Sequence, residues 1–215
     1  MLDTGEFMNP LKNVALHNVI DYGELMFCLR DYKAPHRKIT TLLQSGKLIR
    51  VKKGLYVLGE EDRESPLNKE LLANLIFGPS YVSQEYALQY YGLLLERVMM
   101  VTSMTTKRNK LFHTPIGEYK YTYINVRRFT VGVNWPLIAD KVHVLIASPE
   151  KALADIITTC TDITTQTDMA IHLLDNMRLS KSDLLNFDLR KLDEICHAYH
   201  QPVISLLYET LKRGL

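Results

Sequence analysis

The sequence predicts an α+β protein, in which an N-terminal winged helix-turn-helix is followed by a mixed α+β domain with a helical C-terminal third. Three observations support this prediction. Residues 21–58 show the pattern of helix, helix and two-stranded hairpin. Strand-like segments cluster between residues 97 and 147, and helical patterns fill the chain from residue 148 onward. An α+β protein is the class that fits strands and helices segregated in this way.

Composition places the chain among globular proteins of a reducing compartment. It has 215 residues, 47% of them hydrophobic, and a formal net charge of +2. It contains no uncharged apolar run of about eighteen residues, and its start, MLDTGEF, lacks the basic-then-apolar order of a signal peptide. The three cysteines are odd in number and far apart, which disfavours a disulfide framework. We therefore expect a cytoplasmic protein without a membrane segment.

Two short helices are expected in the N-terminal domain. Asp21 and Glu24 have the spacing of a capping box at the start of the first. The second is expected between Pro35, which suits a first helical turn, and Gly46, which suits a C-terminal end. The face opposite its apolar residues is polar, basic and free of acid, and consists of Arg37, Thr41 and Gln44 with Lys38 and Thr40 beside them.

A hairpin with a basic tip follows directly. Ile49 and Val51 alternate with Arg50 and Lys52, as in a half-buried strand, and a Lys-Gly pair closes a tight turn. Helix, helix and ribbon in this order predict a winged helix-turn-helix, whose second helix enters the major groove of DNA while the ribbon reaches the phosphates. The expected DNA-binding residues are Arg37, Lys38, Thr40, Thr41, Gln44, Lys47, Arg50, Lys52 and Lys53.

The charge distribution agrees with a nucleic-acid partner. Residues 30–53 hold eight basic residues and one acidic residue, although the whole chain is close to neutral. One winged helix covers little DNA, so we expect two copies to bind an inverted repeat as a dimer. The alternative interpretation of the basic hairpin is a solvated turn that keeps a strand edge soluble.

The charged stretch GEEDRESP, residues 59–66, has no apolar periodicity and is predicted to be a linker, which gives domains at 1–62 and 67–215. In the second domain, a helix is expected up to Gly78-Pro79, and another is expected after Ser83 as N-cap, ending at Gly92. Strands are expected at 97–105, 118–126, 128–134 and 141–147. Helices are expected from Ser148 as N-cap and at 167–177, 182–187, 189–199 and 201–215.

Three phrases, in this order, carry a family resemblance. They are LLQSGKLIRVKKGLYVL at 42–58, YVSQEYALQYYGLL at 81–94 and IASPEKALADII at 146–157. Together they resemble the AbiE-type antitoxins (AbiEi family) of type IV toxin–antitoxin and phage-defence loci, over nearly the whole chain. The resemblance implies a non-catalytic protein, and we expect neither a cofactor nor a bound metal. It also implies repression of its own operon through the winged helix and a C-terminal domain that counteracts a co-encoded nucleotidyltransferase-type toxin, directly or indirectly.

Two other functions stay open at this level. One is a plain winged-helix transcriptional regulator without antitoxin activity. The other is a metal-dependent nuclease, because Glu118-Tyr-Lys120 matches half of a nuclease signature, with Glu85 or Glu96 as the nearest partner acids. Alternation of this kind is also typical of an exposed strand.

Several residues have structural interpretations beside the functional ones. Ser83 and Ser148 are explained as helix caps, and Lys151 and Asp155 as an i,i+4 pair on a helix surface. The segment from Cys196 to His200 offers soft metal ligands but lacks a fourth, and Cys160 and His172 are too far apart in sequence to form a motif. Two further basic clusters are open to DNA, a protein partner or solvent: Lys107, Arg108 and Lys110, and Arg127 with Arg128.

Overall fold

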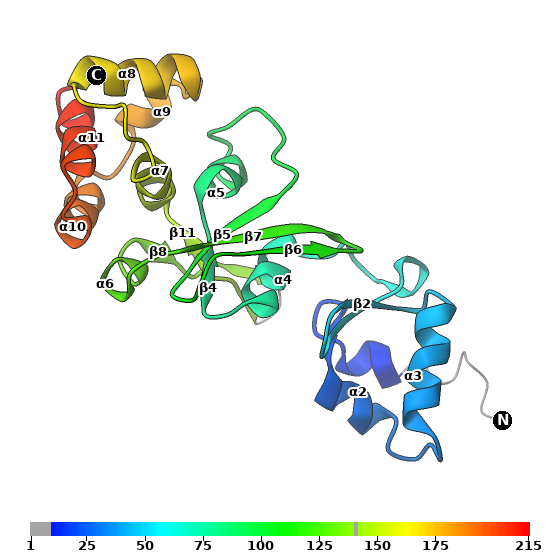
Figure 1. Ribbon diagram of the computed structural model, residues 1–215. Helices are drawn as coiled ribbons and strands as arrows, with labels where there is room; N and C mark the ends of the chain where they lie inside the picture. The colour runs from blue at the N-terminus through cyan, green and yellow to red at the C-terminus, as the bar shows by residue number, and fades with distance from the viewer. Residues whose placement is uncertain (1–9, 140–141) are drawn as a thin grey trace. The chain divides into compact units, whose positions relative to one another are not determined.

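The computed structural model of the chain describes residues 10–139 and 142–215 (Figure 1). The chain forms two compact units. Unit 1 comprises Met1–Leu72 and His113–Gly117, and unit 2 comprises Ala73–Phe112 and Glu118–Leu215. Unit 1 contains the predicted DNA-binding residues, and unit 2 contains the strands and helices expected after the linker.

Unit 1 combines short helices with a three-stranded antiparallel sheet of order β1-β3-β2. Residues 10–14 are helical. They are followed by β1 (Val19–Asp21), α2 (Tyr22–Cys28), α3 (Pro35–Gln44), β2 (Leu48–Lys52), β3 (Leu55–Leu58) and the 3₁₀ turn η1 (Glu60–Asp62). The predicted helices and hairpin are therefore present. Strand β1 was not expected, and η1 lies within the stretch that was predicted to be an irregular linker.

Local capping and one apolar core hold these elements together. The Asp21 carboxylate accepts a hydrogen bond from the Glu24 N–H at 2.8 Å, and the Asp21 N–H donates to the Glu24 carboxylate at 2.8 Å. This confirms the predicted capping box at the start of α2. The core brings together residues from each helix and strand of the unit: Leu11, Ile20, Leu25, Leu29, Ile39, Leu42, Leu48, Tyr56 and Leu58.

Unit 2 is built on a six-stranded mixed sheet of order β6-β7-β5-β4-β11-β8. Its strands are β4 (Ser80–Val82), β5 (Val101–Thr105), β6 (Lys110–Thr114), β7 (Gly117–Tyr123), β8 (Val133–Asn134) and β11 (Ile146–Ala147). Strands β5 and β7 are parallel, as are β4 and β11, whereas β4–β5 and β8–β11 are antiparallel. A separate antiparallel pair is formed by β9 (Leu137–Ala139) and β10 (Val142–His143).

The C-terminal third of the chain is helical, as predicted. It consists of α7 (Pro149–Ile157), α8 (Gln166–Ile171), a π-helix (His172–Asn176), α9 (Lys181–Leu185), α10 (Leu189–Tyr199) and α11 (Pro202–Lys212). The helices that precede them are α4 (Lys69–Ile76), α5 (Gln84–Tyr90) and α6 (Val126–Phe129). Helix α7 packs against α5, β11, α10 and α11, so it occupies the centre of unit 2 (Figure 1).

The strand expected at residues 128–134 is wrong over its first part. Asn125 accepts a hydrogen bond from the Arg127 N–H at 2.9 Å and starts α6 instead. Within that span, only Val133–Asn134 pairs as a strand.

In the part of the chain that the structure describes, no helix is both long and apolar enough to cross a membrane.

Candidate functional site

The outward face of α3 is polar, basic and free of carboxylates. Arg37, Thr40, Thr41 and Gln44 are exposed, and Lys38 is half-buried. The opposite face supplies Ile39 and Leu42 to the core of unit 1. The structure thus places all five α3 residues singled out from the sequence on the accessible side of the helix. A face of this kind presents hydrogen-bonding groups and positive charge without acidic groups that would repel phosphate.

The two threonines on this face have defined hydroxyl orientations. Thr40 Oγ1 donates to the His36 carbonyl at 3.1 Å, and Thr41 Oγ1 donates to the Arg37 carbonyl at 3.1 Å. Each hydroxyl oxygen therefore keeps its lone pairs to accept a hydrogen bond from a ligand. The ring of His36 stacks on that of Tyr22, with centroids 6.5 Å apart, which fixes the first turn of α3 against α2.

The β2–β3 hairpin carries the second set of basic residues. Arg50 and Lys53 are exposed, and Lys47 and Lys52 are half-buried. Gly54 closes the turn with φ of +85°, a left-handed conformation that glycine adopts without strain. Among the described residues, neither Arg50 nor Lys53 forms an ion pair with a carboxylate. Both charges are therefore available to a ligand.

The α3 face and the hairpin belong to one compact unit. Helix α3 packs against β2, and Ile39 and Leu42 of the helix share a core with Leu48 of the strand. Burial of these side chains fixes the direction in which the opposite, basic faces point. The candidate site is therefore a helix face beside a basic ribbon, supported by a common apolar core.

The basic clusters of unit 2 are partly occupied by contacts of their own. Lys107 Nζ donates to the Gly78 carbonyl at 2.5 Å and lies 5.2 Å from the ring centroid of Phe77. Lys110 Nζ lies 4.8 Å from the ring centroid of Phe112. In the other cluster, the Arg128 guanidinium lies 5.2 Å from the centroid of the Tyr199 ring, and Arg127 is exposed. Of the first cluster, only Arg108 is exposed without such a contact among the described residues.

Residues of the segments 81–94 and 146–157 form contacts with one buried carboxylate, that of Asp155. Its Oδ2 accepts hydrogen bonds from Tyr81 Oη at 3.0 Å and Ser83 Oγ at 2.6 Å, and its Oδ1 accepts one from Tyr199 Oη. Lys151 Nζ lies 3.8 Å from Oδ1 and donates to Tyr199 Oη at 2.6 Å. The side chains of Lys151 and Asp155 are both fully buried.

This network corrects two sequence-based expectations. The Lys151–Asp155 pair is real, but it lies in the core and not on the helix surface, because α7 is covered on all sides. Ser83 occupies the N-cap position of α5 but its hydroxyl forms no cap, since it bonds Asp155 instead. Ser148 does cap α7, by accepting from the Lys151 N–H at 3.3 Å. Residues of the second and third phrases therefore form a hydrogen-bonded network that is buried in the core of unit 2.

Burial controls the protonation of this network. Desolvation lowers the pKa of Lys151 from 10.5 to about 8, although the nearby Asp155 opposes the shift. Desolvation also raises the pKa of Asp155, against the effects of Lys151 and of the hydroxyl donors. The pKa values of Tyr81 and Tyr199 are raised well above their usual range, first because both hydroxyls are buried and then because they face Asp155.

The lowered pKa of Lys151 predicts that the contribution of this residue to the stability of unit 2 increases as the pH rises from 7 to about 9.5. Between about 8 and 10.5 the unfolded chain holds a proton that the folded chain has released, so the slope of stability with pH is positive. The expected gain is roughly 1–2 kcal/mol. Urea unfolding at both pH values should show it in the wild type and not in Lys151→Met. Equal pH dependence of the two proteins would contradict the prediction.

The residues considered for a metal-dependent nuclease do not form a common site among the described residues. Glu118 and Lys120 are exposed on β7 and alternate with the buried Tyr119 and Tyr121, as on any half-buried strand. Glu96 lies instead beside Arg178, at 3.2 Å. Within the described ranges, no three His, Cys, Asp or Glu residues are grouped so that they could hold a metal ion.

The ligand candidates near the C-terminus of α10 also have separate partners. Cys196 Sγ lies 3.3 Å from Ser205 Oγ, and His197 Nδ1 lies 2.8 Å from the Asp193 carbonyl. His200 caps the helix in a left-handed conformation. By contrast, Cys160 and His172, which looked unrelated in sequence, are brought together with Sγ and Nε2 3.8 Å apart.

Comparison with known proteins supports the fold alone. No protein-family model and no curated protein matches the chain. Among solved structures, the chain is similar to the RV2827C protein from Mycobacterium tuberculosis, with a TM-score of 0.58 and 15% sequence identity. The match covers 91% of this chain and 74% of that one. The mixed α+β architecture with a helical C-terminal region is thus shared with a solved protein.

Proposed function

We propose that this protein is an antitoxin and autorepressor of the AbiEi type. Unit 1 acts as a winged helix-turn-helix that binds operator DNA of its own operon. Unit 2 counteracts a co-encoded nucleotidyltransferase-type toxin. The protein acts in the cytoplasm, and it binds an inverted repeat as a dimer, because one winged helix buries too little DNA surface for operator specificity.

The observation that supports DNA binding is the acid-free outer face of α3 beside the basic β2–β3 hairpin, both held on one core. Arg37 and Gln44 carry groups that can hydrogen-bond guanine and adenine edges, respectively. Arg50 and Lys53 at the hairpin have no competing carboxylate among the described residues, which suits contact with phosphates. The chain order, α2, α3, then β2 and β3, is that of a winged helix.

The antitoxin half of the proposal rests on the resemblance of the three ordered phrases to AbiE-type antitoxins. Tyr81 and Ser83 of the second phrase donate hydrogen bonds to Asp155 of the third, and Lys151 of the third phrase pairs with it. These residue types are therefore explained by the buried network that they form in unit 2. A plain winged-helix regulator is the second candidate, and it is favoured by the same face of α3. The two differ only in what unit 2 does.

Operator binding is tested with fluorescence anisotropy on the DNA upstream of the gene and on a scrambled sequence of equal length. We expect at least a tenfold preference for the upstream DNA at physiological salt, and a stoichiometry of two chains per inverted repeat. Affinity should fall steeply as salt rises, because phosphate contacts release counterions. Equal affinity for both sequences would leave no role as an operator-specific repressor.

Antitoxin activity is tested by expressing the neighbouring gene from an inducible promoter, with and without this protein. We expect growth arrest by the neighbouring gene product alone and rescue when the two are expressed together. Transcription of the neighbouring gene must come from a promoter that this protein does not bind, so that repression cannot mimic rescue. DNA binding without rescue would favour the plain regulator.

A further inference from the structure

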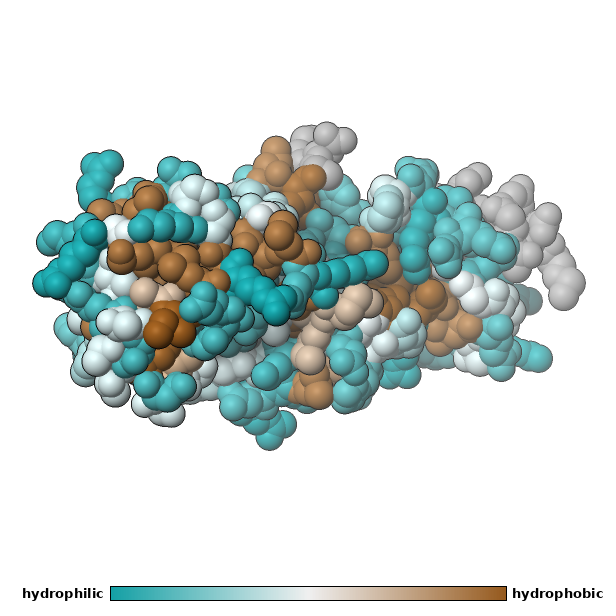
Figure 2. Space-filling view, turned by 90° about the horizontal axis from the view of Figure 1, so that it is seen from above, coloured by the Kyte–Doolittle hydropathy of each residue, from teal (hydrophilic) through white to brown (hydrophobic). Residues whose placement is uncertain are grey.

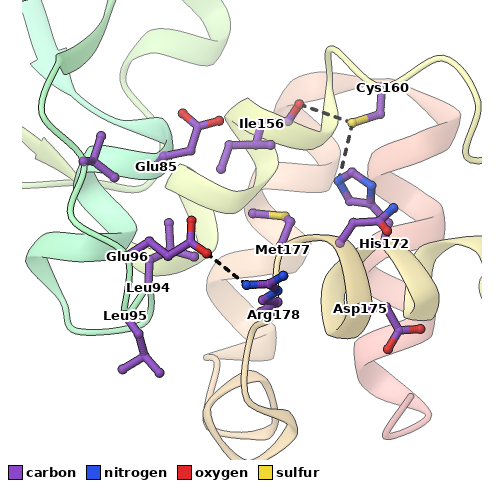
Figure 3. Close-up of a pocket in the computed structure, with 12 residues that line it drawn as sticks. Glu85, Leu94, Leu95, Glu96, Ile156, Cys160, His172, Asp175, Met177 and Arg178 are labelled. Atoms are coloured by element: carbon purple, nitrogen blue, oxygen red, sulfur yellow. Dashed lines mark hydrogen bonds and ion pairs between the residues drawn. The ribbon is translucent and has the colours of Figure 1, made fainter.

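Unit 2 contains an open pocket that DNA binding by unit 1 does not use. It lies between α5 with the segment that follows it, the C-terminal end of α7, and the π-helix with the residues after it (Figure 3). Its volume of about 840 Å³ is within the range of protein sites that hold ligands. Glu85 comes from α5, Ile156 from α7, and Met177 from the segment that follows the π-helix.

The backbone is irregular where it lines this pocket. His172–Asn176 forms a π-helix, and Arg178 directly beyond it has φ of +54°. Gln84 has φ of +59° and immediately precedes Glu85, which lines the pocket from α5. Left-handed conformations cost energy for residues other than glycine, and π-helical turns are rare, so both concentrate at functional sites. Three such features around one pocket point to a site for a ligand.

The pocket is acidic, although the chain as a whole is slightly basic. Glu85, Glu96 and Asp175 contribute three carboxylates against one cation, Arg178. The Arg178–Glu96 pair spans 3.2 Å, and its side chains are 78% and 81% exposed. Exposed pairs contribute little stability, so an incoming guanidinium or ammonium group can take the place of Arg178 on Glu96. The pocket therefore selects cationic ligands.

Apolar surface continues beyond the pocket. The side chain of Leu95 at the rim is 98% exposed, and Met99 further along the same segment is 65% exposed. Ile171, which precedes His172 of the pocket, is also exposed, and Figure 2 shows apolar side chains gathered over the C-terminal helices of this unit. A small molecule in the pocket would leave this surface in water, whereas a protein segment can cover it.

We propose that this pocket is a docking site for a protein segment in which arginine or lysine side chains alternate with large apolar ones. The cationic groups of the segment bind Glu85, Glu96 and Asp175, and its apolar groups pack on Leu95 and Met99. This inference deepens the antitoxin half of the proposed function. The identification of the partner as the co-encoded protein rests on that proposed function. The chemistry of the docked segment follows from the pocket alone.

The first measurement uses the full chain and a fluorescein-labelled peptide of twelve residues, with leucines at helical spacing and four arginines between them. Two matched peptides replace every leucine by serine or every arginine by glutamate. We expect the Leu/Arg peptide to bind at least tenfold more tightly than either. Equal binding of the Ser/Arg peptide would overturn the inference, because it would show attraction by charge alone.

The site itself is tested with the variant Glu85→Gln/Glu96→Gln/Asp175→Asn, which keeps side-chain shape and removes three charges. All three side chains are exposed, so the fold should tolerate the change. We expect at least a tenfold loss of affinity for the Leu/Arg peptide. The control variant Glu60→Gln/Glu61→Gln/Glu64→Gln removes three exposed carboxylates of unit 1 and should bind as the wild type does. Equal losses in both variants would overturn the inference.

Two further outcomes separate this inference from the proposed function. If the wild type binds the purified co-encoded protein, and the pocket variant does not bind it but keeps its affinity for DNA, both the docking site and the proposed function are supported. Peptide binding at the pocket without binding of the co-encoded protein supports the docking site and removes direct contact with that toxin. If the pocket variant instead abolishes self-association of the chain in sedimentation experiments, the occupant is a second copy and the inference is overturned.

Discussion

Replacing Asp155 with asparagine is expected to lower the free energy of unfolding of unit 2 by about 3–5 kcal/mol. Asparagine keeps the shape of the side chain, but it carries no charge, and its NH2 group cannot accept at one of the two oxygen positions to which Tyr81, Ser83 and Tyr199 donate. The Lys151 ammonium would then be buried, at zero exposure, without its counterion. Thermal unfolding should show the loss as a fall in the midpoint of roughly 10 °C or more.

The exposed pair in the same unit provides a matched control. Arg178 and Glu96 also pair a cation with a carboxylate, at 3.2 Å, but in solvent. Glu96→Gln should therefore cost less than about 1 kcal/mol. In a double-mutant cycle, Lys151→Met should relieve part of the cost of Asp155→Asn, because it removes the unpaired charge. Strictly additive losses, or a cost for Asp155→Asn no larger than for Glu96→Gln, would refute the role of the network.

Removing two charges from the hairpin, with Arg50→Ala/Lys53→Ala, is expected to weaken operator binding by about 10- to 30-fold at physiological salt. Each phosphate contact adds about 0.9 to the slope of log affinity against log salt, so the slope should fall by roughly 2. Both side chains are exposed, and the change should leave the fold intact. Anisotropy titrations at several salt concentrations measure affinity and slope together.

Charge alone is controlled with Lys181→Ala/Arg190→Ala in unit 2, which removes two exposed basic residues far along the chain. This variant should bind operator DNA within about twofold of the wild type. A second comparison, Gln44→Ala, should reduce the preference for the upstream sequence by roughly 1–3 kcal/mol without changing the salt slope. If the hairpin variant keeps the wild-type slope, the hairpin does not contact phosphate.

Local patterns predicted the elements with clear signals. Pro35 and the apolar spacing of Ile39 and Leu42 defined α3, and Ser148 with Pro149 defined the start of α7. Strand β1 was missed because three residues are too few for an alternating pattern to stand out. The first part of 128–134 looked like a strand because the helix cap before it, Asn125, was assigned to the preceding predicted strand at 118–126, whereas β7 ends at Tyr123. Short elements of this kind are decided by tertiary pairing.

The residues that matter most to unit 2 were the hardest to interpret from sequence. An i,i+4 Lys–Asp pair is usually a surface pair, and only the apolar residues all around α7 signalled that this helix is buried. Tyr199 is 44 residues from Asp155, so nothing local joined them. The meeting of Cys160 with His172 depends equally on how α7 and the π-helix pack. By contrast, the exposed face of α3 follows from the helical spacing of its apolar residues alone, so it could be predicted from the local sequence.

The position of Tyr199 at the end of α10 has a consequence for how the protein is made. The core residues of unit 1 run from Leu11 to Leu58, so they all leave the ribosome early. Asp155 receives its third hydroxyl only after Tyr199 has been synthesised. At roughly 5–20 residues per second, the newborn chain carries an incomplete unit 2 for several seconds after unit 1 has emerged. A truncated translation product would therefore keep the basic α3 face and lack a finished unit 2.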